Sequence, residues 1–155
     1  MATSADTAPP APPIGKAYPP LVYAVGREKI REFARATGET NPVHLDVAAA
    51  RAAGNADLVA PPMFAVVYAG EALGAGLFDP ETGIDMDRLV HGAQAFTWGR
   101  PVVAGEEITT VLSLDEVRHV ASVDLTHYVF GSRSTAEDGT VVSTGRWSNI
   151  VRGAA

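Results

Sequence analysis

The chain of 155 residues contains no cysteine, which excludes disulfide cross-links, thiolate metal sites and a cysteine nucleophile. Acidic residues outnumber basic ones by 18 to 12, giving a formal net charge of −6, and no basic stripe suggests a nucleic-acid partner. The 4 histidines are scattered and form no pattern such as His-Glu-x-x-His. A Gly-x-Ser-x-Gly elbow and a phosphate-binding glycine loop are also missing. We therefore expect no metal and no other cofactor.

Long apolar runs are missing as well. The longest weakly polar stretch, residues 58–77, contains Glu71 and is rich in alanine and glycine, so we expect a buried helix and not a membrane span. Residues 1–13 are rich in alanine, proline and threonine but lack the positive charge and apolar centre of a secretory signal. We predict a disordered arm over residues 1–17 and a cytoplasmic protein.

A hydrophobic content of 46% lets a chain of this length bury one core without cross-links. We place this single domain at residues 18–152. Apolar residues recur at the spacing of one helical face over residues 27–37, which predicts a helix there. Four β segments are expected at residues 89–98, 108–117, 122–133 and 141–152, with a hairpin turn at 136–139. The pattern indicates the α+β class.

The helix expected within residues 58–77 has many small side chains in its interior. Its three interior glycines, Gly70, Gly74 and Gly76, each cost roughly 1 kcal/mol of helix propensity relative to alanine. Such a helix must be held by its surroundings. We predict a curved antiparallel sheet wrapped closely around it.

Two prolines, Pro61 and Pro62, precede this helix and suit its first turn, where a missing amide hydrogen costs nothing. The next amide donors belong to Met63 and Phe64. A helix start with free amides is suited to bind an oxygen that gains negative charge during a reaction.

The run from Gly38 to Asp46, Gly-Glu-Thr-Asn-Pro-Val-His-Leu-Asp, places a carboxylate and an imidazole five positions apart across a turn. Gly38 suits the end of the first helix, and Asp46 suits the N-cap of a short helix over residues 47–53. Glu39 and His44 would then lie in a tight link between two helices. Such a pair can hold and activate one water by general acid–base chemistry.

A simpler interpretation of the same run stays open. An acid and a histidine five residues apart occur often by chance, and the spacing alone is weak support for catalysis. Asn41 and Pro42 would then be only a turn, Asp46 only a cap, and His44 a solvated surface residue.

The whole run resembles the hydratase motif of the MaoC-like, (R)-specific enoyl-CoA hydratase family, Gly-Asp-x-Asn-Pro-x-His-x-Asp. The resemblance covers roughly residues 18–150. Residues 58–64 look like the segment before the central helix of a hot-dog fold. Residues 90–96 and 100–106 look like the first long strand and turn of MaoC N-terminal dehydratase-like domains. These MaoC N-terminal dehydratase-like domains are similar to one subunit of the two-subunit (3R)-hydroxyacyl-thioester dehydratases of actinobacteria.

This resemblance implies a single hot-dog domain that adds water reversibly to a 2-enoyl thioester of coenzyme A or acyl carrier protein. It implies that Glu39 deprotonates the water while His44 orients it and relays a proton, with Asn41 supporting the loop. It further implies substrate-binding positions at Asn41, Pro62, Met63, Phe64 and His91, although a structural role for His91 stays open. Two such folds would lie side by side, as a homodimer or as a heterodimer with a MaoC-like subunit. Neither a nucleic acid nor a membrane is an expected partner.

The chain departs from the family motif at two positions. Glu39 stands where the family has aspartate, and Pro62 stands where single-domain hydratases have a glycine whose amide donates. These departures support an alternative in which the chain is the non-catalytic, substrate-binding subunit of a heterodimeric dehydratase. A hot-dog thioesterase is a third possibility, but it does not explain residues 41–44. The sequence leaves the choice between catalyst and binding subunit open.

Overall fold

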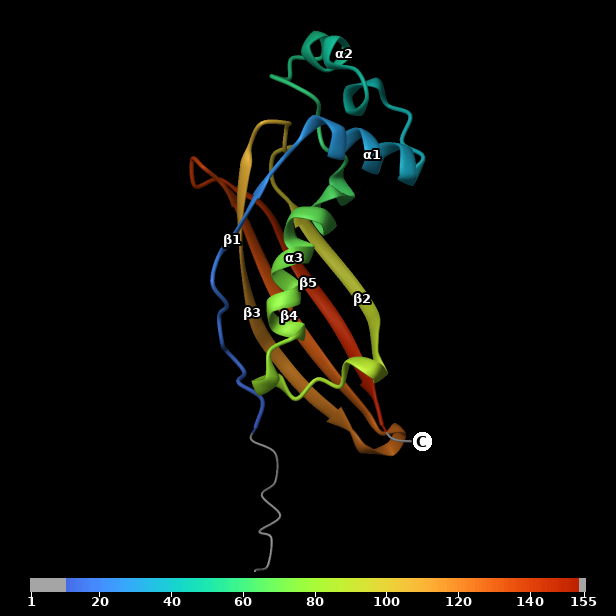
Figure 1. Ribbon diagram of the computed structural model, residues 1–155, viewed down its shortest axis with the longest axis vertical. Coiled ribbons are helices and arrows are strands. Elements are labelled where there is room, and N and C mark those ends of the chain that lie inside the picture. The colour runs from blue at the N-terminus through green and yellow to red at the C-terminus, as the bar shows by residue number, and fades with distance from the viewer. Residues whose placement is uncertain (1–10, 154–155) are drawn as a thin grey trace, which may run out of the picture.

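The computed structural model describes residues 11–153 and contains one antiparallel sheet with three α-helices (Figure 1). The strands occur in the order β1-β3-β4-β5-β2 across the sheet. Their bounds are β1 (Leu21–Ala24), β2 (Leu89–Trp98), β3 (Glu107–Val120), β4 (Leu125–Ala136) and β5 (Val141–Arg152). The helices are α1 (Arg27–Thr37), α2 (Val47–Ala52) and α3 (Ala65–Leu77). The α+β class is therefore confirmed.

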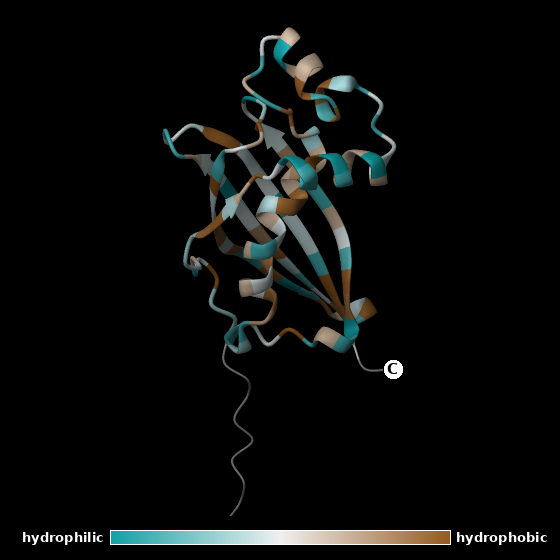
Figure 2. Ribbon diagram, turned by 45° about the horizontal axis from the view of Figure 1, so that its top comes forward, coloured by the Kyte–Doolittle hydropathy of each residue, from teal (hydrophilic) through white to brown (hydrophobic). Residues whose placement is uncertain are grey.

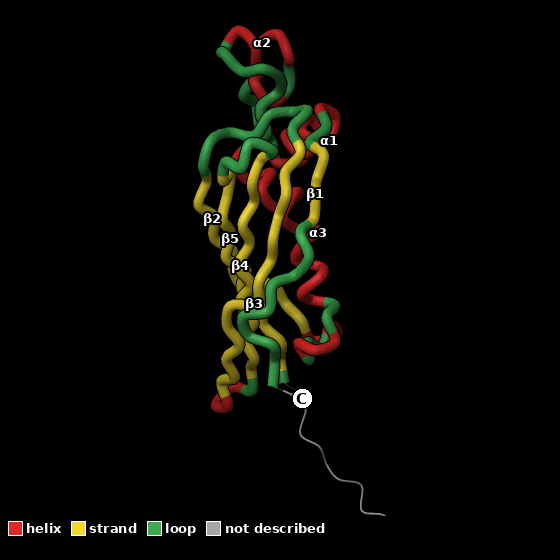
Figure 3. The backbone as a smooth tube through the Cα atoms, turned by 90° about the vertical axis from the view of Figure 1, so that its left-hand side faces the viewer, coloured by secondary structure: helices red, strands yellow, loops and turns green. Residues whose placement is uncertain are grey.

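The sheet curves around α3, which packs against β1, β3 and β4 (Figures 1 and 3). Apolar and polar residues follow one another along the strands, as expected of a sheet whose two faces differ (Figure 2). At the centre of the core, Phe64 at the start of α3 and Phe130 on β4 are fully buried. Neither α3 nor any other helix in the described part of the chain is long and apolar enough to cross a membrane.

The glycines of α3 differ in their surroundings. A β-carbon on Gly76 would overlap the ring of Phe130 and come within 2.9 Å of Leu112 Cδ2. At Gly70 and Gly74 a β-carbon would meet nothing within 4 Å. The close packing of the sheet on α3 therefore explains why residue 76 is a glycine. Gly70 and Gly74 lie on a face of α3 that the rest of the described chain leaves open.

Two strands have the predicted bounds, and two differ. β2 and β5 match residues 89–98 and 141–152. β3 continues to Val120, and β4 begins at Leu125, three residues later than predicted. The difference arises because residues 121–123 form a 3₁₀ turn that ends at Asp124, whose left-handed φ of 47° breaks the extended backbone.

The predicted ends of the first helix and of the link after it are confirmed. α1 ends at Gly38 in a left-handed conformation, with φ 73°. The side chain of Asn41 accepts a hydrogen bond from the Val43 amide and caps a 3₁₀ turn, and the Asp46 side chain caps α2 through the Ala48 amide. Short polar side chains thus shape the link locally.

The predicted arm at residues 1–17 lies mostly outside the described residues. Its last part runs beside β3, where the Gly15 amide donates to Leu114 O at 2.7 Å and Lys16 O accepts from the Leu114 amide at 3.0 Å. The Lys16 ammonium also bonds Asp79 at 2.7 Å and Glu81 at 2.9 Å. Contacts with the domain therefore begin before residue 18.

Candidate active site

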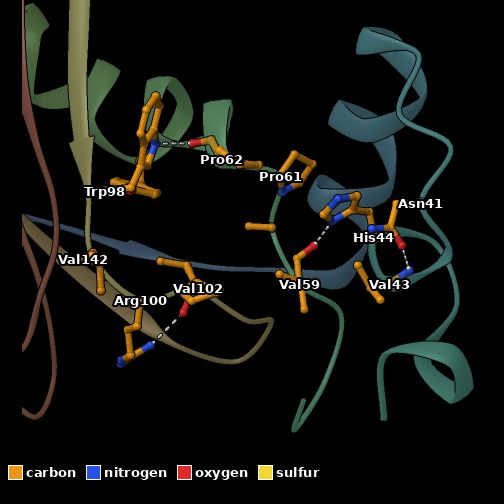
Figure 4. Close-up of a pocket in the computed structure, with 14 residues that line it drawn as sticks. Asn41, Val43, His44, Val59, Pro61, Pro62, Trp98, Arg100, Val102 and Val142 are labelled. Carbon is orange, nitrogen blue, oxygen red and sulfur yellow. Dashed lines mark hydrogen bonds between the residues drawn. The ribbon is translucent and has the colours of Figure 1, made fainter. Parts of the chain in front are cut away.

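A cavity of about 360 Å³ lies between the link after α1, the turn before α3 and the end of β2 (Figure 4). Most of its wall is apolar, formed by Val43, Val59, Ala60, Pro61, Val102 and Val142. Its size and lining suit a small organic ligand with an apolar part.

His44 supplies an imidazole to the wall of this cavity. The residue is only 7% exposed, and its Nδ1–H donates to the Val59 carbonyl oxygen at 2.7 Å. A carbonyl can only accept, so the proton of the neutral ring is on Nδ1, and Nε2 keeps a free lone pair. The backbone bond from the Val59 amide to Val43 O, 3.0 Å long, fixes the same two segments together. His44 is therefore not a solvated surface residue but an oriented acceptor at the cavity wall.

Glu39 is placed differently. Its side chain is exposed and does not line the cavity. Its amide donates to Ala34 O at 2.8 Å and so belongs to the hydrogen bonds that end α1. The structure thus brings His44, but not the Glu39 carboxylate, to the cavity.

Asn41 lies in the cavity wall beside His44. Its Oδ1 accepts from the Val43 amide at 3.2 Å, so the part of the side chain that is engaged holds the turn in place. The Asn41 side chain therefore shapes the link, and the apolar residues of the cavity wall remain to contact a ligand.

The turn before α3 has fewer backbone amide donors than it would have with a glycine in place of Pro62. Pro62 lines the cavity but has no amide hydrogen, and the Phe64 amide already donates to Pro61 O at 2.8 Å. The Met63 amide has no acceptor within the described residues, although Met63 and Phe64 do not line the cavity. One free amide therefore remains at this helix start.

His91 lies away from the cavity, on β2 opposite Asn149 of β5. Its ring packs edge-on against Trp147, with ring centroids 6.5 Å apart. Near it, Gln94 Nε2 and Asn149 Nδ2 are buried and have no hydrogen-bond partner among residues 11–153. His91 therefore lies near the side-chain amides of Gln94 and Asn149. It is not brought together with His44 at the cavity.

Three cavity residues carry polar groups that sequence reasoning missed. The Trp98 indole donates to Pro62 O at 2.8 Å, and the Tyr68 hydroxyl donates to Ser143 Oγ at 3.0 Å. Burial raises the pKa of Tyr68. Arg100 pairs with Glu106 at 2.7 Å. The predicted strand did end at Trp98, but no local pattern predicts that its ring meets a proline 36 positions earlier.

The family follows from a match over most of the chain. The family model of the FAS1-like dehydratase domain region matches residues 13–145. The chain belongs to this family. A UPF0336 protein of Clavibacter michiganensis subsp. michiganensis is 60% identical over 95 residues, 61% of this chain and 64% of that protein. A UPF0336 protein of Leifsonia xyli subsp. xyli is 46% identical over 142 residues, 90% of this chain and 93% of that protein.

Solved structures agree on the hot-dog fold. A MaoC-like dehydratase superposes with a TM-score of 0.80 at 29% identity, covering 91% of this chain but only 42% of that longer chain. A truncated HadBC (3R-hydroxyacyl-ACP dehydratase) complex from Mycobacterium tuberculosis gives a TM-score of 0.71 at 28% identity, covering 88% of this chain and 96% of that one. Solved structures similar to this chain thus include hot-dog dehydratases.

Proposed function

We propose that this chain takes part in the reversible hydration of 2-enoyl thioesters, carried by coenzyme A or acyl carrier protein, as the subunit that holds the acyl group. A second, MaoC-like chain that keeps the aspartate form of the motif supplies the complete acid–base pair. The observation that carries the proposal is the cavity itself, which has apolar walls and His44 but lacks the Glu39 carboxylate.

The chemistry makes clear which groups are needed. In hydration, a base takes a proton from water as the water oxygen bonds C3 of the enoyl chain. An acid then delivers a proton to C2, and amide donors stabilise the negative charge on the thioester oxygen in between. His44 Nε2 can accept a hydrogen bond from such a water, whereas the Met63 amide, which has no acceptor among residues 11–153, belongs to a residue outside the cavity lining. The chain alone therefore provides an acyl site and part of the catalytic set.

The strand next to the cavity offers a place for the second chain. β2 forms one edge of the sheet and is ten residues long, with no proline and no Asp, Glu, Lys or Arg. Unpaired backbone groups on a long uncharged edge favour the addition of another strand. The opposite edge, β1, has only four residues and follows Pro19 and Pro20, which protects it. A partner paired along β2 would reach Trp98, Gly99 and Arg100 in the cavity wall.

A second candidate is catalysis by this chain itself. The orientation of His44 favours it, because a buried imidazole whose Nδ1 is fixed by a carbonyl presents a defined lone pair to a water. In that case the Glu39 carboxylate must turn toward the cavity when substrate binds.

Hydration of trans-2-butenoyl-CoA, followed by loss of enone absorbance, separates the two candidates. In a complex of this chain with a MaoC-like partner, we expect Glu39→Gln to leave kcat unchanged. Replacing the aspartate of the partner's motif is expected to abolish turnover. Turnover lost on Glu39→Gln, and kept on the partner's substitution, would assign the catalysis to this chain instead.

A further inference from the structure

We propose that Trp98 determines which acyl groups the cavity accepts: its ring forms a wall that contacts the bound acyl group, and its N–H fixes the turn before α3. This inference rests on the proposed acyl-thioester function. It assigns to the end of β2 a binding role in addition to pairing with β5.

The geometry joins the two parts of this role. Trp98 is the last residue of β2, and its Nε1–H donates to the Pro62 carbonyl oxygen at 2.8 Å (Figure 4). The indole therefore connects the edge strand to the residue that opens the turn before α3. The ring is held at the proline by its N–H, and the residue lines the cavity.

A neighbouring aromatic ring also contacts Trp98. Phe96 packs against it with ring centroids 6.0 Å apart. A β-carbon on the following residue, Gly99, would overlap the carbonyl oxygen of Val141, so the chain can turn here only without a side chain. The Gly99 amide also donates to Val142 O at 2.9 Å. The direction of Trp98 is thus fixed by its neighbours before any ligand arrives.

Exposure distinguishes Trp98 from the other tryptophan of the chain. Trp98 is 47% exposed although it lines the cavity, so part of its surface in this chain is free to contact a ligand. Trp147 is 4% exposed, and its Nε1–H donates to Ser132 Oγ at 2.9 Å. When an apolar group covers a large, half-exposed aromatic ring beside an apolar cavity, the removal of apolar surface from water favours binding. An acyl chain has the chemistry to do so.

The chain contains 2 tryptophans, so a Trp147→Phe variant reports on Trp98 alone. Saturated thioesters that cannot react, butanoyl-CoA and the bulkier 2,2-dimethylpropanoyl-CoA, serve as probes, with free coenzyme A as the control. We expect both thioesters, but not free coenzyme A, to change the Trp98 emission. If Trp147→Phe does not fold, the difference between the emission of the wild type and of Trp98→Phe gives the same signal.

Substitutions then test selectivity, with affinities measured by calorimetry on the chain and on its complex with a MaoC-like partner. We expect Trp98→Ala to shift the ratio of affinities toward the bulkier thioester by about tenfold or more, the usual range for reshaping an apolar pocket. Trp98→Phe keeps a ring but loses the N–H, and we expect about fivefold weaker binding with a smaller change in the ratio. Phe78→Ala, at an exposed aromatic residue after α3, is the matched control and should change neither quantity.

The outcomes separate this inference from the proposed function. Thioester binding that leaves the Trp98 emission unchanged, with the same selectivity in wild type and Trp98→Ala, would overturn the inference and leave the function standing. Failure of the wild-type chain and of its complex to bind either thioester by calorimetry would overturn both.

Discussion

Replacing two glycines of α3 by alanine tests how closely the sheet wraps the helix. Gly74→Ala adds a methyl group on the open face, and Gly76→Ala adds the same group against Phe130 and Leu112. Both positions are in the same helix and two residues apart. The gain in helix propensity is therefore nearly equal in the two variants and cancels when they are compared.

The magnitudes follow from that difference. Replacing a helical glycine by alanine stabilises by about 1 kcal/mol when the new methyl group meets nothing, so Gly74→Ala should raise the free energy of unfolding by that amount. At Gly76 the methyl group must displace two side chains that are fully buried, and such overpacking costs about 1–3 kcal/mol. Gly76→Ala should therefore be about 1–3 kcal/mol less stable than Gly74→Ala.

Urea unfolding followed by circular dichroism measures both variants and the wild type. With an m-value of about 2 kcal/mol/M, Gly74→Ala should move the midpoint up by about 0.5 M, and Gly76→Ala should fall below Gly74→Ala by about 0.5–1.5 M. Equal midpoints for the two variants would refute the close packing of α3 on Phe130. A lower midpoint for Gly74→Ala in a monomeric sample would refute the open face.

Further predictions concern ion pairs and the histidine. The Arg27 guanidinium lowers the pKa of Asp57 from 3.8 to about 2, so the pair stabilises the fold fully above pH 4 and progressively less as the pH falls to 2. Asp57→Asn should remove that part of the pH dependence in urea titrations, and an unchanged slope between pH 4 and 2 would contradict it. Lys16→Met removes the ammonium that bonds two carboxylates, so hydrogen exchange at the Gly15 amide should accelerate, which NMR can detect. His44→Ala leaves a buried carbonyl without its donor and should lower the free energy of unfolding by about 1–3 kcal/mol, measured by thermal melts; no loss would argue against the described bond.

Local chemistry explains which parts of the fold could be predicted. Gly38, Asn41 and Asp46 act on their own neighbours in the chain, through a left-handed backbone or a side-chain cap, and all three lie where the sequence indicated. The ends of β2 and β5 also lie at the predicted residues. Asp124 was not, because many aspartates could adopt a left-handed conformation and only the pairing of β3 with β4 selects this one.

The site was predictable in part. The run around His44 is continuous, and a family motif pointed to it. The direction of the Glu39 side chain depends on how α1 ends, since its amide completes the helix while its carboxylate faces solvent. The bond between Trp98 and Pro62 joins segments that meet only after the sheet has curved around α3. Contacts of this kind depend on tertiary structure and leave no local pattern.

We propose that this chain holds an acyl group between apolar walls and presents one oriented imidazole, and that a partner chain brings the carboxylate that Glu39 does not provide. The uncharged edge of β2, next to Trp98, is where we expect the two chains to pair.

The most direct test of this claim is the initial rate of hydration of trans-2-butenoyl-CoA by the purified chain, before and after a MaoC-like partner is added. We predict no hydration by the chain alone, and a hydration rate that appears as the partner is added and saturates when the two chains are equimolar. A full rate from the chain alone, abolished by Glu39→Gln and unaffected by the partner, would contradict this prediction.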